Sequence, residues 1–344
     1  MTDTAPPATP RRHGPGRWVR AGLVVVALAL CIAFLLPRAG EIGESFSRQT
    51  PLSLGGSFVV GALAAYATFL SWRALLAGAG HRLPGGAARR LFFVSQIGKY
   101  IPGSIWPIVA QADLGRRHGV PATRSVTVGL LTLLVSCAAG VCVAAATLPF
   151  VSADALGRYW YVLLLVPVVL VALHPAVLRF ALRTASRLLR RELAEVRLPL
   201  RSVVVAFVLA AVAWLLFGLH VALLAGPLGA AGPSTIVLAT GSYALAWLVG
   251  FLVFFLPAGL GGREVVLTTL LTNAAGLDLE DAVSIALASR VLLSLVDVVA
   301  FAVTSLAERR RGHHGRCGTD AGDDASGDDV DHGPSAAVPG RSAS

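Results

Sequence analysis

The chain has 344 residues, of which 55% are hydrophobic and only 14% are charged, and its mean hydropathy is +0.72. Soluble domains carry about a quarter charged residues, so this composition excludes an ordinary soluble protein. The net charge of +10 could indicate binding to nucleic acid. However, the arginines cluster at the ends of apolar runs, as in the basic cytoplasmic loops of membrane proteins. We therefore predict an all-α, polytopic membrane protein that does not bind nucleic acid.

The chain is expected to have three parts, in order a disordered cytoplasmic N-terminus at 1–17, a membrane domain at 18–307 and a disordered cytoplasmic tail at 308–344. An amphipathic helix on the inner leaflet is expected within 179–201, where arginines recur. Residues 234–277 are expected to form either two membrane crossings or a re-entrant hairpin. The total is therefore six to eight membrane helices. The other membrane helices are predicted at 18–36, 52–77, 126–149, 159–180, 203–224, 235–255 and 282–306.

The most unusual stretch is 88–124, which contains two apolar runs, at 91–97 and 105–110. Each run is far shorter than the roughly 20 residues needed to cross a bilayer. Arginines flank the stretch on both sides, so the positive-inside rule places both flanks in the cytoplasm. We predict a broken, re-entrant hairpin that lines a cavity, because lipid cannot satisfy irregular backbone. The residues that break the helix are Gly98, Pro102, Gly103 and Pro107.

Lys99, between these breakers, is the single lysine of the chain, whose 29 basic residues are otherwise arginines. An ammonium group among apolar neighbours is expected to face a cavity. The alternative is that Lys99 lies at the interface and extends its ammonium group to water.

A second broken segment, L-P-A-G-L-G-G-R-E at 256–264, is similar to the first. Each is followed by a short helix and then a matching stretch, G-V-P-A-T-R-S-V at 119–126 and G-L-D-L-E-D-A-V at 276–283. The first is flanked by basic residues and the second by acidic ones, as an inverted repeat predicts. Chance similarity between apolar stretches remains the alternative. The breakers of the second segment are Pro257, Gly259 and Gly262.

Several charged residues lie in or beside the predicted spans, where each costs about 2.5–3.5 kcal/mol unless it finds a partner or a cavity. Asp297 follows Arg290 by two helical turns and therefore lies on the same face. We expect Glu264 and Asp297 to hold two of the cations while the others face an anionic headgroup. In the alternative, all of them pair with one another and serve only helix packing.

The motifs G-K-Y-I-P-G-S-I-W-P and F-L-P-A-G-L-G-G-R-E resemble the lysylphosphatidylglycerol synthase transmembrane family, also called the flippase-like domain. The resemblance covers about residues 18–307, and Ala258 departs from it where a second glycine is usual. It implies a bacterial or archaeal plasma-membrane protein that handles lipid-linked substrates. Its best-known members pass an aminoacylated phospholipid across the bilayer and carry an aminoacyl-transferase domain. We expect that domain to be missing here, because only a short tail follows Arg311.

These observations favour a flippase-like protein for an anionic or lipid-linked substrate, with no enzymatic activity, metal or cofactor. A nucleotide-binding loop of the G-x-x-x-x-G-K-[ST] type is absent from the sequence, so transport would not use ATP directly. Two alternatives stay open, a scaffold that binds envelope-synthesis enzymes and an intramembrane lipid transferase. The transferase is disfavoured because the only dense aspartate cluster lies in the predicted tail. The predicted substrate-binding residues are Arg73, Lys99, Tyr100, Trp106, Arg263, Glu264, Arg290 and Asp297.

Overall fold

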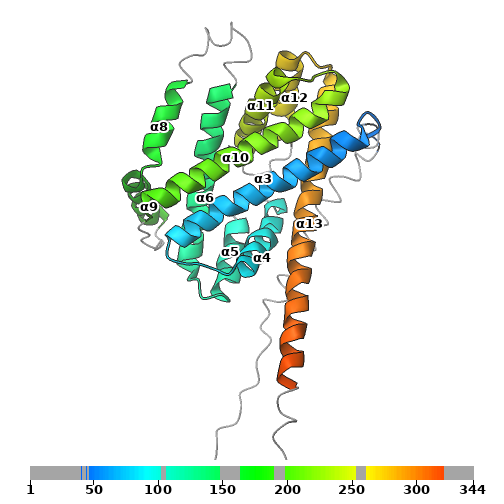
Figure 1. The fold of residues 1–344 in the computed structure, drawn as a ribbon. Coiled ribbons are helices and arrows are strands. Elements are labelled where there is room, and N and C mark those ends of the chain that lie inside the picture. The colour runs from blue at the N-terminus through cyan, green and yellow to red at the C-terminus, as the bar shows by residue number, and fades with distance from the viewer. Residues whose placement is uncertain are drawn as a thin grey trace, which may run out of the picture. The chain divides into compact units, whose positions relative to one another are not determined.

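All secondary structure in the described part of the chain is helical, in a computed structural model (Figure 1). The structure describes residues 40, 44, 46–101, 106–147, 163–189, 198–252 and 261–320. By their contacts, residues 1–304 form one unit and residues 305–344 a second, and the site discussed below lies entirely in the first. The elements are α3 (Pro51–Gly78), α4 (Gly85–Gln96), η2 (Ile97–Tyr100), α5 (Trp106–Arg116), α6 (Ala122–Thr147), α8 (Leu165–Ala172), α9 (Pro175–Leu189), α10 (Leu200–Ala225), η5 (Gly226–Leu228), α11 (Pro233–Leu252), α12 (Gly262–Ala275) and α13 (Leu279–Asp320).

Five of the described helices are long and apolar enough to cross a bilayer, namely α3, α6, α10, α11 and the Leu279–Ala307 part of α13. This confirms the predicted polytopic all-α class. Apolar side chains such as Val208 and Leu215 on α10 and Leu63 on α3 are exposed, as expected of surfaces that face lipid tails. The first predicted membrane helix, at 18–36, lies outside the described residues.

Small residues allow these helices to pack closely, as is common in membrane proteins. The long contact between α3 and α10 includes Gly78, where an added Cβ would lie 2.5 Å from the hydroxyl oxygen of Ser202. Between α10 and α11, a Cβ at Gly218 would meet the side chain of Thr240. The bundle therefore depends on glycine at these crossings.

The predicted hairpin at 88–124 consists of α4, the 3₁₀ turn η2 and α5, which pack against one another below α3 in Figure 1. At 1.5 Å per residue, α4 and α5 are about 18 and 16 Å long, roughly half of a bilayer core. Gly98 lies where the two arms touch, because an added Cβ would be 3.0 Å from main-chain atoms of Trp106 and Pro107. Pro102 and Gly103 lie outside the described residues.

The second broken segment joins α11, which is long enough to span, to the short α12, and the two helices pack together. Gly250 of α11 provides the close approach, because an added Cβ would be 3.0 Å from Cβ of Arg263. Gly262 begins α12, whereas Pro257 and Gly259 lie outside the described residues.

The two stretches aligned in the sequence have the same local conformation. Gly119 and Gly276 both have positive φ, +74° and +67°, and each is followed by a buried residue, Val120 or Leu277. One residue later, the carbonyl oxygens of Pro121 and Asp278 each accept a 3.0 Å hydrogen bond from the fourth residue beyond. Helices α6 and α13 therefore begin in the same way. An αL glycine that ends one helix before another is a common device, so the inverted relation of the two halves remains a prediction.

Two predicted helices differ from the structure. The segment predicted to span at 159–180 is broken at residues 173 and 174 into α8 and α9, because Pro175 lacks an N–H group and disfavours helical backbone in His174. The amphipathic segment accordingly begins at Pro175, before the predicted start. The last helix continues to Asp320 beyond the predicted end at residue 306, so residues 308–320, expected to be disordered, are helical. Residues 308–311 favour helix, whereas Gly312, Gly315 and Gly318 do not, so residue propensity explains only the first turn of this extension.

Candidate functional site

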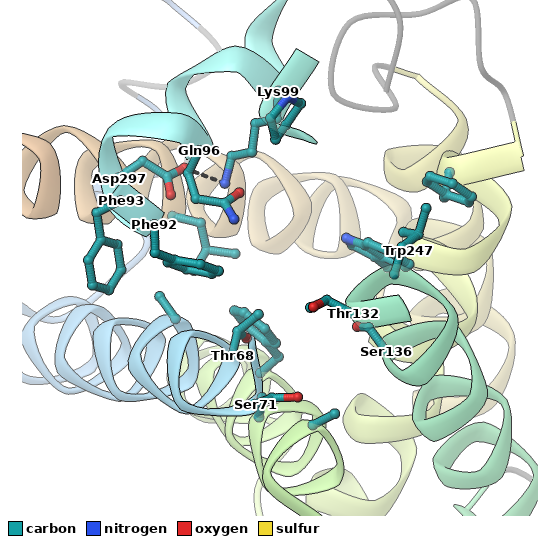
Figure 2. Close-up of a pocket in the computed structure, with 18 of the residues that line it drawn as sticks. Thr68, Ser71, Phe92, Phe93, Gln96, Lys99, Thr132, Ser136, Trp247 and Asp297 are labelled. Atoms are coloured by element: carbon teal, nitrogen blue, oxygen red, sulfur yellow. Dashed lines mark ion pairs between the residues drawn. The ribbon is translucent and has the colours of Figure 1, made fainter. Parts of the chain in front are cut away.

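A cavity of about 300 Å³ lies between the hairpin and the spans α3, α6, α10, α11 and α13 (Figure 2). The first turn of α12 also reaches it, so both broken segments contribute to its wall. Of the predicted substrate-binding residues, five line the cavity: Lys99, Tyr100, Arg263, Arg290 and Asp297.

Lys99 and Tyr100 of η2 are held to α13 by one carboxylate. Lys99 Nζ lies 2.6 Å from Oδ2 of Asp297, and the Tyr100 hydroxyl donates a 2.6 Å hydrogen bond to the same oxygen. The Asp297 side chain is 8% exposed, whereas that of Lys99 is 37% exposed. Asp297 therefore fastens the break of the hairpin to a full membrane span.

Arg290 is held in a comparable way by Glu264 of α12, with 3.2 Å between Nη1 and Oε1. The other Glu264 oxygen accepts a 2.8 Å hydrogen bond from the main-chain N–H of Gly261, which caps the start of α12. Glu264 is not among the residues that line the cavity, and it holds a cation as expected. Counted from Leu279, Arg290 and Asp297 lie about 17 and 27 Å along α13, on either side of the middle of its span.

Arg263 differs from the other cavity cations, because no carboxylate in the described part of the chain lies within ion-pair distance of it. Its guanidinium carbon lies 4.4 Å from the ring centroid of Tyr243, a cation–π contact. Its Nη2 also lies 3.5 Å from the hydroxyl oxygen of Ser289. Arg263 is thus positioned by neutral groups and keeps its charge available.

Behind Arg263, a chain of buried polar groups crosses the bundle through His220. The Nε2 atom of His220 lies 3.0 Å from the Ser289 hydroxyl, and its Nδ1 atom lies 2.8 Å from the carbonyl oxygen of Ser57. All three residues are 0% exposed. A neutral ring with its proton on Nδ1 satisfies both contacts, since it donates to Ser57 and accepts from Ser289. The chain ties α10 to α3 and α13.

The other predicted residues lie elsewhere. Arg73 is exposed on α3 and does not line the cavity, and Trp106 is half-buried at the start of α5, also outside the cavity lining. Pro107 lines the cavity, while Gly98 serves the close approach of the two hairpin arms.

The neutral part of the cavity wall was not predicted from the sequence. This part combines hydroxyl groups, amides and aromatic rings, most of which come from the spans. The spacing of hydroxyl residues along the predicted spans could have indicated it, because two such residues three or four positions apart lie on the same helix face. The neutral polar and aromatic residues include Thr68, Ser71, Phe92, Phe93, Gln96, Gln111, Thr132, Ser136, Trp214, Phe217, Trp247, Phe251 and Ser294.

Among the described residues, no group of three or more His, Cys, Asp or Glu side chains is arranged to hold a metal ion. The site described above instead offers cations, neutral hydrogen-bonding groups and aromatic surface. These are groups that bind an anion and an uncharged polar molecule.

No curated protein matches the chain. The family model described as the lysylphosphatidylglycerol synthase TM region matches residues 19–300, most of the chain and all of the cavity. The chain therefore belongs to this family of integral membrane proteins.

Proposed function

We propose that this protein binds an anionic, lipid-linked substrate in the cavity and translocates it across the plasma membrane. The observation that carries the proposal is Arg263, a cavity cation with no carboxylate partner among the described residues. Lys99 and Arg290 are already neutralised by Asp297 and Glu264. A guanidinium group presents a planar set of donors that matches a phosphate group, so Arg263 is the expected phosphate ligand.

The position of Arg263 supports this role. It is the second residue of α12, so the positive end of the helix dipole adds to its charge. In many transporters, discontinuous helices bring such ends to the bilayer midplane, where the substrate binds. Here, α12 and the hairpin are both too short to span, and both reach the cavity. Movement of either broken segment would expose the cavity to one side of the membrane or the other.

The proposed orientation places both termini and both ends of the hairpin in the cytoplasm. It rests on the basic residues at the start of α4 and the end of α5, which include Arg82, Arg89, Arg116 and Arg117. The acidic start of α13, with Glu280 and Asp281, then lies on the outer side. The substrate would thus pass between a basic and an acidic face. We expect no ATP hydrolysis or other enzymatic step.

The test is a lipid translocation assay in proteoliposomes that contain a fluorescently labelled anionic phospholipid. Arg263→Ala is expected to lower the rate of translocation about tenfold or more, and Arg263→Lys is expected to restore part of it, because the charge remains while the planar donors are lost. Arg73→Ala is the matched control, since Arg73 is also basic and lies on the span α3 but is exposed outside the cavity. Equal loss in Arg73→Ala and Arg263→Ala, or no translocation by the native protein, would contradict the proposal. Absence of translocation by the native protein would favour the alternative function, a scaffold that binds envelope-synthesis enzymes.

A further inference from the structure

The cavity has a band of hydroxyl groups that charge alone does not explain. Thr68 and Ser71 are three residues apart on α3, and Thr132 and Ser136 are four apart on α6, so each pair shares a helix face. Figure 2 shows the two pairs on either side of the same space. Three of these hydroxyls donate to main-chain carbonyl oxygens at 2.8–2.9 Å and so keep only acceptor capacity for a ligand. The Ser136 hydroxyl has no partner among the described residues and can also donate.

Two glutamine amides add donors to this band. Gln111 is 5% exposed, and its oxygen accepts a 3.1 Å hydrogen bond from the indole N–H of Trp72. An indole can only donate, so the oxygen of the Gln111 amide must face Trp72 and its NH₂ group is the free end. The amide of Gln96, which Figure 2 shows beside Lys99, has no hydrogen-bond partner in the described part of the chain.

Aromatic rings form another part of the wall. Trp247 is stacked on Phe251, with centroids 5.5 Å apart and 6° between the planes, and it meets Trp214 edge to face at 5.2 Å. The Trp214 indole N–H donates to the carbonyl oxygen of Ser136, which fixes this ring beside the hydroxyl band. Flat aromatic faces of this kind pack well against the C–H groups of a sugar or cyclitol ring.

These groups discriminate between headgroups. A hydroxyl group of a ligand both donates and accepts, and only a mixed set of neutral donors and acceptors satisfies several of them together. An aminoacyl headgroup is cationic and needs a free carboxylate, but Asp297, the carboxylate that lines the described cavity, is already paired with Lys99. Arg263 and Arg290 would also repel such a headgroup.

We propose that the substrate is a phosphate-linked neutral polyol, that is, a lipid whose phosphate carries an uncharged sugar or inositol ring. This inference rests on the proposed function, with Arg263 as the phosphate ligand. The ring lies between the hydroxyl pairs of α3 and α6, with one face against Trp247. Two lipids supply this chemistry, a polyprenyl phosphate hexose and phosphatidylinositol. The cavity groups that select the ring are Thr68, Ser71, Gln96, Gln111, Thr132 and Ser136.

The test is a competition for the purified full chain in nanodiscs. Equal amounts of polyprenyl phosphate hexose, phosphatidylinositol, phosphatidylglycerol and lysylphosphatidylglycerol are offered, and the lipid retained by the protein is quantified by mass spectrometry. We expect one or both of the ring-bearing lipids to be enriched at least about fivefold over phosphatidylglycerol, with lysylphosphatidylglycerol least retained. Which of the two is enriched identifies the source of the ring.

Two variants connect this preference to the band. Thr132→Val and Gln96→Leu are each expected to reduce the enrichment about three- to tenfold, the usual effect of one neutral hydrogen bond. Thr304→Val is the matched control, because its hydroxyl makes the same bond within a helix, to the carbonyl oxygen of Ala300, outside the cavity. Neither test substitution removes a hydrogen bond between helices, so the variants should fold.

The outcomes separate the two proposals. If Arg263→Ala lowers retention of all anionic lipids but phosphatidylglycerol competes equally with the ring-bearing lipids, the polyol inference is wrong and the proposed function stands. Preferential retention of lysylphosphatidylglycerol would also overturn the inference. If no lipid depends on Arg263, both proposals fail.

Discussion

The ion pair between Lys99 and Asp297 allows a quantitative test of how the hairpin is held. Lys99→Met leaves a carboxylate that is 8% exposed, whereas Asp297→Asn leaves an ammonium group that is 37% exposed and can still reach water. Breaking a buried pair costs about 3–5 kcal/mol when the remaining charge stays buried. Because the Tyr100 hydroxyl continues to stabilise Asp297, we expect the lower end, about 3 kcal/mol, for Lys99→Met. For Asp297→Asn we expect about 1 kcal/mol, since exposure reduces the penalty.

The assay is a double-mutant cycle on the free energy of unfolding in detergent, followed by tryptophan fluorescence. The double variant Lys99→Met/Asp297→Asn should be more stable than Lys99→Met alone, because no buried charge remains. The resulting coupling energy should exceed about 1 kcal/mol. A coupling below about 0.5 kcal/mol, or a larger loss for Asp297→Asn than for Lys99→Met, would refute the argument that burial of Asp297 determines the cost.

Substitutions at three further sites test the packing and the buried polar groups in the same unfolding assay. Gly98→Ala should cost about 2 kcal/mol, because the new Cβ would be 3.0 Å from main-chain atoms of the other hairpin arm. The control Gly55→Ala, with nothing within 4 Å, should cost nothing, and equal effects would contradict the close-approach argument. His220→Leu should cost about 1–2 kcal/mol, because hydrogen bonds between membrane helices contribute about 0.6 kcal/mol each and a buried carbonyl loses its donor. If His220→Leu instead stabilised the protein, the neutral His220 ring could not be a favourable link between α10 and the helices α3 and α13. Glu264→Ala should cost more than Glu264→Gln, since glutamine can still cap α12; equal costs would show that the cap contributes nothing.

The sequence was sufficient for the class, for the two broken segments and for the charges near the cavity. Short apolar runs and helix breakers are local signals, so the hairpin could be predicted from residues 88–124 alone. That Glu264 and Asp297 would hold two of the cations followed from the small number of carboxylates within spans, but the pairing of Lys99 with Asp297 and of Arg290 with Glu264 could be assigned only from the structure. These predictions succeeded because a charge in a membrane has few acceptable environments.

Other features could not be read from the sequence, because they depend on which helix faces meet. Thr132 and Gln111 resemble ordinary polar residues of membrane helices, and only the packing of α5 and α6 directs them into the cavity. Arg73 and Arg263 both adjoin apolar runs, yet only Arg263 lines the cavity. The break before Pro175 was missed because the apolar run continues on both sides of it.

The most direct test of the central claim is mass spectrometry of the lipids that copurify with the native protein, with Arg263→Ala and with Arg73→Ala. The account predicts a specific phosphate-bearing lipid that is enriched in the native protein and in Arg73→Ala and lost in Arg263→Ala. Retention of only bulk phospholipid, in the same amounts by all three proteins, would contradict the claim that Arg263 binds a substrate in this cavity.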